Sequence, residues 1–381
     1  MLKIKLSFLL FFSFAFFSAE IHAENKRSKE IKEKIRQFSN PIDEVVICDL
    51  VTFINRRLST QTDKLRAVIA WIANNFEYDI ENIFAYDYYG DPQELIDHML
   101  KNRKGICVHF AYLFSEIANR LGIKTYVITG YTIQRGLIDT LSHAWTASFV
   151  NSTWLLTDPT WTVGHIEGHE FIKAHNDAFF LITPENLIRT HMPFDPLWQF
   201  LHYPISHQEF YEGVQFASKN NPFFNYADTL KLYENSTKLE QLISTLRRIE
   251  RSIVGNTLAV NQLFNIQRQM EAYENRIVVA RYNVAVVLYN DGVAKLNNFI
   301  DGWSRQLFSK KSQAEVRGMV KSIEKLLINS LNGLQEIETT DINTKKSIAE
   351  FKVLVEGTLA RTNDLSGFID NYFNARNARR Q

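Results

Sequence analysis

A β-hairpin is predicted by residues 142–161, which read SHAWTASFVNSTWLLTDPTW. The side chains expected on one face recur at every second position, which is the period of a β-strand. They are His143, Trp145, Ala147 and Phe149 in the first half, and Trp154, Leu156 and Asp158 in the second. The Asn and Ser between the halves are typical turn residues. The hairpin thus carries a histidine near its start and an aspartate near its end.

The position of the turn decides how this histidine and aspartate face each other. If the two turn residues are Val150 and Asn151, His143 lies directly opposite Asp158. If they are Asn151 and Ser152, the two are diagonal neighbours about 7–8 Å apart between Cα atoms, which long side chains still span. In either register the carboxylate can fix the imidazole tautomer while the other ring nitrogen faces a nucleophile.

A candidate nucleophile precedes the hairpin. Cys107 follows the turn formed by residues 104–106 and opens a stretch whose apolar residues fall on one helical face: Phe110, Phe114, Ile117 and Leu121. A thiol at a helix N-terminus feels the positive end of the helix dipole, which favours the reactive thiolate. The backbone N–H of Cys107 is also free to help hold an oxyanion. These are requirements of acyl transfer, so we predict a triad of Cys107, His143 and Asp158.

The motifs around these three residues resemble those of the transglutaminase-like cysteine enzymes. The matching motifs are Gly105-Ile106-Cys107, Ser142-His143-Ala144-Trp145 and Asp158-Pro159-Thr160-Trp161. Flanking blocks are similar to those of bacterial and kyphoscoliosis-peptidase-like members: residues 63–72 with Phe76-Glu77-Tyr78-Asp79 upstream, and residues 180–184, His191-Met192-Pro193 and Trp198-Gln199 downstream. The resemblance extends over roughly residues 42–205.

The resemblance implies an α+β fold with a papain/transglutaminase-like core. It also implies that Cys107 is the nucleophile, His143 the base and Asp158 the residue that orients the base. One departure is His109, two residues after the nucleophile, where a small or amide residue is expected. His109 and His191 are predicted to be structural.

The composition excludes several other classes of protein. The net charge of +1 gives no electrostatic reason to bind nucleic acid. The sequence has no glycine-rich phosphate loop, Cys-x-x-Cys pair or His-Glu-x-x-His helix, so we predict no cofactor and no metal. The second cysteine, Cys48, lies in an apolar stretch and is predicted to be a buried free thiol. The alternative in an exported chain is a disulfide with Cys107, which would consume the nucleophile.

The first 23 residues are predicted to be a signal peptide. Lys3 and Lys5 give a basic start, and the apolar run from Leu6 to Ala19 is shorter than the ~20 residues that span a bilayer. Residues 24–40 are charged and predicted to be a tether. The mature protein is therefore expected to be exported, periplasmic or secreted, with no integral membrane span after cleavage.

The distribution of proline suggests a domain boundary. All eight prolines lie between Pro41 and Pro222. We therefore predict a transglutaminase-like domain over 41–222 and an all-α domain over 223–381, built as a bundle of four or five long helices. Within it, Ser312 and Glu315 form a predicted capping box, followed by apolar residues at helical spacing: Val316, Val320, Ile323 and Leu327.

Two functions remain open from the sequence. The first is an exported cysteine peptidase or amidase, or a transamidase, that acts on a protein or peptide substrate through a thioester acyl-enzyme. The second is an inactive transglutaminase-like interaction or scaffold protein, whose helical domain binds a partner protein of the cell envelope. We favour hydrolysis.

Overall fold

The computed structural model describes residues 30, 33, 35, 38, 44–214, 216, 219–252 and 257–378. The predicted signal peptide, residues 1–23, lies outside the described residues, as does most of the predicted tether. The chain divides into two compact units, Met1–Ile266 and Gln267–Gln381. They are called the N-terminal unit and the helical unit below.

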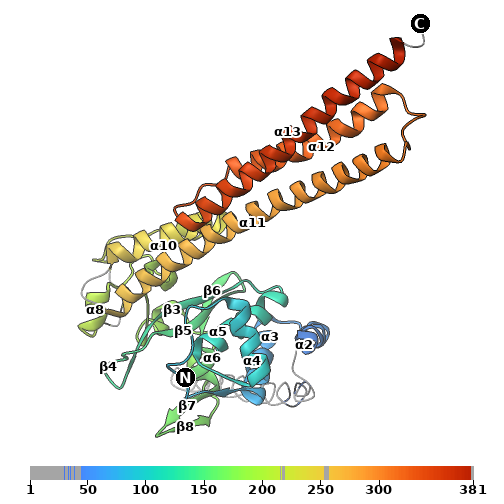
Figure 1. The fold of residues 1–381 in the computed structure, drawn as a ribbon. Helices are drawn as coiled ribbons and strands as arrows, with labels where there is room; N and C mark the ends of the chain where they lie inside the picture. The colour runs from blue at the N-terminus through green and yellow to red at the C-terminus, as the bar shows by residue number, and fades with distance from the viewer. Residues whose placement is uncertain are drawn as a thin grey trace, which may run out of the picture. The chain divides into compact units, whose positions relative to one another are not determined.

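The first half of the N-terminal unit is helical. Its helices are α2 (Glu44–Arg57), α3 (Gln61–Asn75), α4 (Pro92–Asn102) and α5 (Cys107–Arg120). Thr60 caps α3 by accepting the Asp63 N–H, and Asp91 caps α4 with a proline in the first turn. The four apolar residues predicted for one face of this helix are buried, and α5 packs against the sheet described next (Figure 1). As predicted, this helix begins at Cys107.

Helix α2 corrects one expectation from the sequence. Cys48 is a free thiol, as predicted, but it is exposed. The reason is helical periodicity, because Ile47, Leu50 and Ile54 form the buried face of α2 and Cys48 falls outside it.

A curled antiparallel sheet forms the second half of the core. Its strands are β3 (Thr125–Gln134), β4 (Leu137–Ile138), β5 (His143–Val150) and β6 (Thr153–Thr157), in the order β4-β3-β5-β6, and β9 (His191–Pro193) also pairs with β3. The β5–β6 register pairs Val150 with Thr153, so the turn residues are Asn151 and Ser152, the second of the two predicted registers. Both have positive φ, 49° and 65°, as in the type I′ turns that match strand twist.

Strand β3 lies between β5 and β9. Gly130 pairs with His143 on β5 and with Pro193 on β9. A Cβ atom at Gly130 would lie 2.1 Å from the Met192 carbonyl oxygen, so the close approach of β9 requires glycine here. The mixed α+β architecture is the one predicted.

Shorter elements complete the N-terminal unit. They are β1 (Glu77–Tyr78), β2 (Lys104–Gly105), α6 (Pro159–Val163), β7 (Gly164–Glu167), β8 (Glu170–Lys173), η1 (Asp177–Phe179), α7 (Pro184–Leu187), η2 (Pro196–Gln199), α8 (His207–Tyr211), α9 (Tyr226–Asn235) and α10 (Lys238–Ser252). The parallel pair β1–β2 sets Tyr78 opposite Gly105, two residues before the predicted nucleophile.

The division between the units lies later than the predicted boundary at 222/223. Helices α9 and α10 belong to the N-terminal unit because they are anchored to it. Leu230 of α9 packs in the same apolar cluster as Trp198, and Arg248 of α10 forms a 2.8 Å ion pair with the buried Asp195. The first ten residues of α11 (Thr257–Ser304) also fall within this unit.

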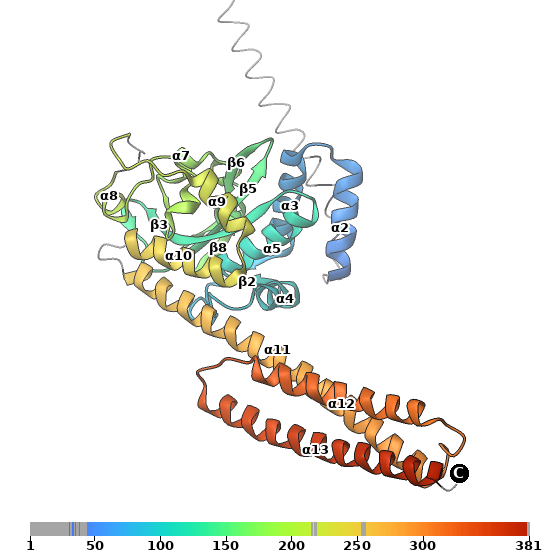
Figure 2. The same cartoon turned by 90° about the horizontal axis from the view of Figure 1, so that it is seen from above.

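The described residues of the helical unit form three long helices; the predicted range 223–381 also includes α9 and α10, so five described helices fall within it. The three helices of the unit are the remainder of α11, α12 (Gln313–Gln335) and α13 (Ile342–Ala378), which lie side by side (Figure 2). The predicted capping box opens α12, with the Ser312 hydroxyl accepting the Glu315 N–H and the Glu315 carboxylate accepting the Ser312 N–H. All four apolar residues predicted for its inner face are buried.

Among the described helices, none combines the length and the hydropathy needed to span a membrane.

Candidate active site

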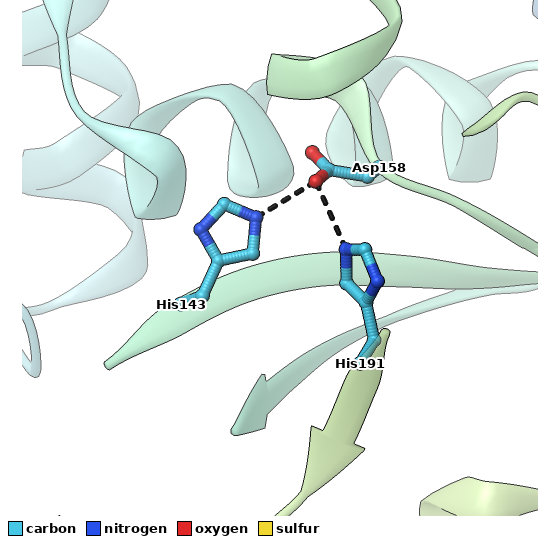
Figure 3. Close-up of side chains that lie close together, drawn as sticks. All are labelled: His143, Asp158 and His191. Atoms are coloured by element: carbon cyan, nitrogen blue, oxygen red, sulfur yellow. Dashed lines mark hydrogen bonds and ion pairs between the residues drawn. The ribbon is translucent and has the colours of Figure 1, made fainter. Parts of the chain in front are cut away.

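His143 and Asp158 meet at one end of the β5–β6 hairpin. His143 is the first residue of β5, and Asp158 follows β6 as the N-cap of α6. The His143 Nε2 atom lies 2.7 Å from Asp158 Oδ2 (Figure 3). Both side chains are buried. The diagonal relation left open by the sequence is thus close enough for a direct hydrogen bond.

The carboxylate of Asp158 is held on all sides. Its Oδ1 atom accepts the backbone N–H groups of Thr160 at 2.8 Å and Trp161 at 3.1 Å, which makes it the cap of α6. Its Oδ2 atom bonds His143 and, at 3.1 Å, Nε2 of His191. Burial opposes ionisation, but these partners outweigh it and hold the pKa of Asp158 well below its ordinary value.

His191 also belongs to this cluster, although the sequence predicted only a structural role for it. It comes from β9, is fully buried, and places its Nδ1 atom 2.8 Å from the Thr190 hydroxyl. Burial lowers the pKa of His191, and the neighbouring charge of His143 acts in the same direction. A neutral imidazole that accepts from Thr190 at Nδ1 carries its proton on Nε2, where it donates to Asp158.

Of the two histidines, His143 is therefore the one that carries a positive charge. Burial alone would lower the pKa of His143, but the carboxylate of Asp158 and the sulphur of Cys107 outweigh it and raise the pKa to about 10. The hydrogen bond to Cys107 contributes to this rise, so the thiol lies within reach of the imidazole. Because Nε2 faces Asp158, Nδ1 is the nitrogen left for Cys107, and it points away from the carboxylate (Figure 3).

Tyrosines surround the thiol. The Tyr78 oxygen lies within hydrogen-bonding reach of both the backbone N–H and the side chain of Cys107. Burial and the sulphur of Cys107 hold the pKa of Tyr78 far above its ordinary value, so its hydroxyl keeps its proton. The Tyr88 hydroxyl is buried without a hydrogen-bond partner among the described residues, and burial likewise raises its pKa. The sequence motif included Tyr78, but it did not predict that Tyr78 lies beside Cys107, which depends on the β1–β2 pairing.

His109 supports the nucleophile's helix from within. Its Nδ1 atom accepts the Ile106 N–H at 3.1 Å and so caps the first turn of α5. Burial lowers the pKa of His109 to about 4, so it is a neutral acceptor at ordinary pH. The role is structural, as predicted.

A cleft of about 1010 Å³ opens above Cys107 and His143. Its walls include Tyr78 and Tyr88, the β4–β5 loop and β7. Four further lining residues come from the start of α11, all inside the N-terminal unit: Leu258, Asn261, Phe264 and Asn265. The predicted boundary at 222/223 had assigned these residues to a separate domain.

The same cluster raises the question of a metal ion. The ligand atoms of His143, Asp158 and His191 lie within 4.8 Å of one another. Both imidazoles already hydrogen-bond the same carboxylate oxygen, at 2.7 and 3.1 Å. A metal ion would have to displace both of these ring protons, so hydrogen bonding alone accounts for the cluster.

Comparison with known proteins identifies the class to which this domain belongs. The model of the transglutaminase-like superfamily matches residues 49–159, a range that includes Cys107, His143 and Asp158. The chain therefore carries a transglutaminase-like domain, which confirms the resemblance drawn from its motifs.

The individual relatives share low sequence identity with this chain and match it over only part of their length. Kyphoscoliosis peptidase of Mus musculus and of Homo sapiens is 27% identical over 186 residues, which cover 46% of this chain and 27% of each relative. Cytokinesis protein 3 of Saccharomyces cerevisiae is 28% identical over 202 residues, or 50% of this chain and 22% of that protein. The chain thus spans about a quarter of the length of these relatives. A solved structure of a putative cysteine protease from Cytophaga hutchinsonii is 22% identical, with a TM-score of 0.25, and the match covers 39% of this chain and 50% of that one.

Proposed function

We propose that this protein is a cysteine peptidase or amidase that hydrolyses amide bonds in protein substrates. The observation that carries the proposal is the alignment of three groups at the cleft: Cys107 within reach of one nitrogen of His143, and Asp158 bonded to the other. The name of the kyphoscoliosis peptidases supports a protein substrate. Transamidation by the same acyl-enzyme is the related alternative.

The first chemical step is attack on the amide carbonyl. The imidazolium of His143 carries at Nδ1 the proton given up by Cys107, and the thiolate forms a bond to the carbonyl carbon. The electron pair of the carbonyl moves to its oxygen, which is bound by two donors beside the thiol. One is the Cys107 backbone N–H. The other is the Tyr78 hydroxyl, which stays protonated and lies within hydrogen-bonding reach of Cys107.

The second step expels the amine. The tetrahedral intermediate collapses, the C–N bond breaks, and the imidazolium of His143 gives its proton to the departing nitrogen. A thioester to Cys107 remains. Water then attacks the thioester with His143 as base and releases a carboxylic acid and the free thiol. An amine in place of water would give a new amide, which is the transamidase outcome.

Asp158 keeps His143 effective through both steps. Its carboxylate fixes the ring so that Nδ1 faces the thiol and stabilises the imidazolium. His191 and the cap of α6 in turn fix the carboxylate. The site thus needs no reorganisation when charge moves from sulphur to oxygen.

The test is to trap the acyl-enzyme. Because Cys48 is exposed and would also react, the experiment uses the full chain with Cys48→Ser. We expect iodoacetamide at mildly acidic pH, and a nitrophenyl ester, each to add one group to Cys107 as read by mass spectrometry. Variants with His143→Ala should lose this reactivity. Comparing acid and amide products in the presence of an added amine separates hydrolysis from transamidation.

If Cys107 reacts no faster than a free thiol, the proposal fails. That result would favour the non-catalytic interaction protein that the sequence left open.

We further propose that the protein is exported, because residues 1–23 have the basic start and short apolar run of a signal peptide. Mass analysis of the N-terminus of the protein recovered from outside the cytoplasm tests this. The envelope partner expected for the helical region stays a prediction.

A further inference from the structure

The rim of the cleft is lined by exposed apolar side chains. Four large ones come from four separate elements: Phe84 from the loop after β1, Leu141 from the β4–β5 loop, Ile166 from β7 and Phe264 from α11. Their exposed fractions are 82%, 39%, 47% and 61%. Single exposed apolar residues are ordinary on a protein surface, but several gathered around one cavity mark a binding site for apolar groups.

The cleft is also poor in charge. Apart from its tyrosines, histidines and Cys107, only Arg135 and Asp139 can carry a charge among its 29 lining residues in the described part of the chain. The whole sequence is 22% charged, so the cleft is depleted. Asp139 is occupied by hydrogen bonds from Thr132 and Gln134. With one such side chain of each sign, the cleft has little net charge to attract a strongly acidic or basic ligand.

The size and polar groups of the cleft fit a polypeptide chain. A volume of about 1010 Å³ is at the top of the range of small-molecule sites, about 300–1,000 Å³, so it holds several side chains. Amide side chains on its walls, among them Asn176 and Asn261, offer both donors and acceptors, as an extended main chain requires.

We propose that the cleft binds an extended, uncharged polypeptide segment with bulky apolar side chains on both sides of the reacting amide. Folded proteins keep such segments buried. The substrate is therefore an unfolded or locally unfolded chain, recognised by its apolar side chains. This inference rests on the amide chemistry proposed above for Cys107.

The experiment measures binding apart from turnover. The full chain with Cys107→Ala is titrated against short fluorescein-labelled peptides by anisotropy. Each peptide has a central glutamine, which presents side-chain and main-chain amides, flanked by Leu and Phe, by Ser, or by Asp and Lys. We expect the Leu/Phe peptide to bind at least about tenfold more tightly than the other two.

Rim variants locate the effect. Phe84→Ser and Phe264→Ser should each weaken binding of the Leu/Phe peptide about tenfold and leave the Ser peptide unaffected. Both residues are well exposed, so folding is preserved, and circular dichroism checks it. The matched control is Leu232→Ser on α9, which is 70% exposed and lies outside the cleft, and it should change nothing.

The proposal is overturned if the three peptides bind alike, if the charged peptide binds best, if none binds, or if Leu232→Ser costs as much as Phe84→Ser. Its failure is distinct from failure of the proposed chemistry. A peptide preference without any acylation of Cys107 in the unmutated chain refutes the enzyme and keeps the binding site. Acylation without preference does the opposite.

Discussion

Replacing His191 with alanine is expected to impair catalysis although this side chain does not touch the thiol. The change removes the N–H that bonds Asp158 Oδ2 at 3.1 Å. A hydrogen bond to a buried charged group contributes about 1.5–3 kcal/mol. If that energy is expressed in the transition state, kcat falls about 10- to 100-fold, since about 1.4 kcal/mol is a factor of ten.

The pH dependence identifies this role. The depressed pKa of Asp158 contributes stability that is present above the unfolded-state value and lost as pH falls through the folded-state value. Without the donor on His191 the folded-state pKa of Asp158 rises, although it stays depressed by His143. The stabilisation at neutral pH is therefore smaller, and acid unfolding begins at a higher pH. Circular dichroism across an acid titration measures this shift.

Two further variants provide the rescue and the control. His191→Gln keeps an N–H donor and should recover most of kcat and of the acid resistance. His207 is also buried but bonds the Tyr131 hydroxyl and the Phe194 carbonyl, away from the triad. His207→Ala should lower stability and leave kcat unchanged. Equal losses of kcat in His191→Ala and His207→Ala, or no recovery with Gln, would refute the positioning role.

Further expectations concern the triad and the anchor of α10. Cys107→Ala should abolish amide cleavage while lowering the free energy of unfolding by only about 1 kcal/mol, as read by turnover and by urea denaturation. Asp158→Asn should shift the pH at which kcat/KM falls on the alkaline side from about 10 toward the ordinary histidine pKa near 6.5. The reason is that the Asp158 carboxylate raises the pKa of His143 and so keeps the imidazolium present up to higher pH. An unchanged alkaline pKa in the kcat/KM profile would contradict the assignment. Arg248→Ala should cost about 3–5 kcal/mol in urea denaturation because it leaves the buried Asp195 carboxylate without its cation, and Arg248→Lys should restore part of it.

Local signals in the sequence predicted the parts of the fold that local physics determines. The helix at Cys107, the hairpin strands and the capping box at Ser312 depend on residues within a few positions of one another. The hairpin register stayed open between two turns, because the alternation of side chains alone does not fix which two residues form the turn. The positive φ angles of Asn151 and Ser152 decide it in the structure.

Long-range pairing accounts for what the sequence did not reveal. His191 reaches Asp158 because β9 pairs with β3, and Tyr78 reaches Cys107 because β1 pairs with β2. The observed boundary between the units lies later than the predicted one for the same reason, because the ion pair of Arg248 with Asp195 joins residues 53 positions apart. Neither partner in these pairs carries a motif that points to the other.

The double duty of Asp158, which caps α6 and orients His143, bears on how this protein's descendants can be interpreted. A lineage that abandons catalysis can replace Cys107 at small cost, because only a sulphur atom is lost. It cannot discard the aspartate without also unfastening a helix. Among such descendants the aspartate would therefore be retained for its structural role. The presence of Cys107 is therefore a better indicator of retained catalysis than the presence of Asp158.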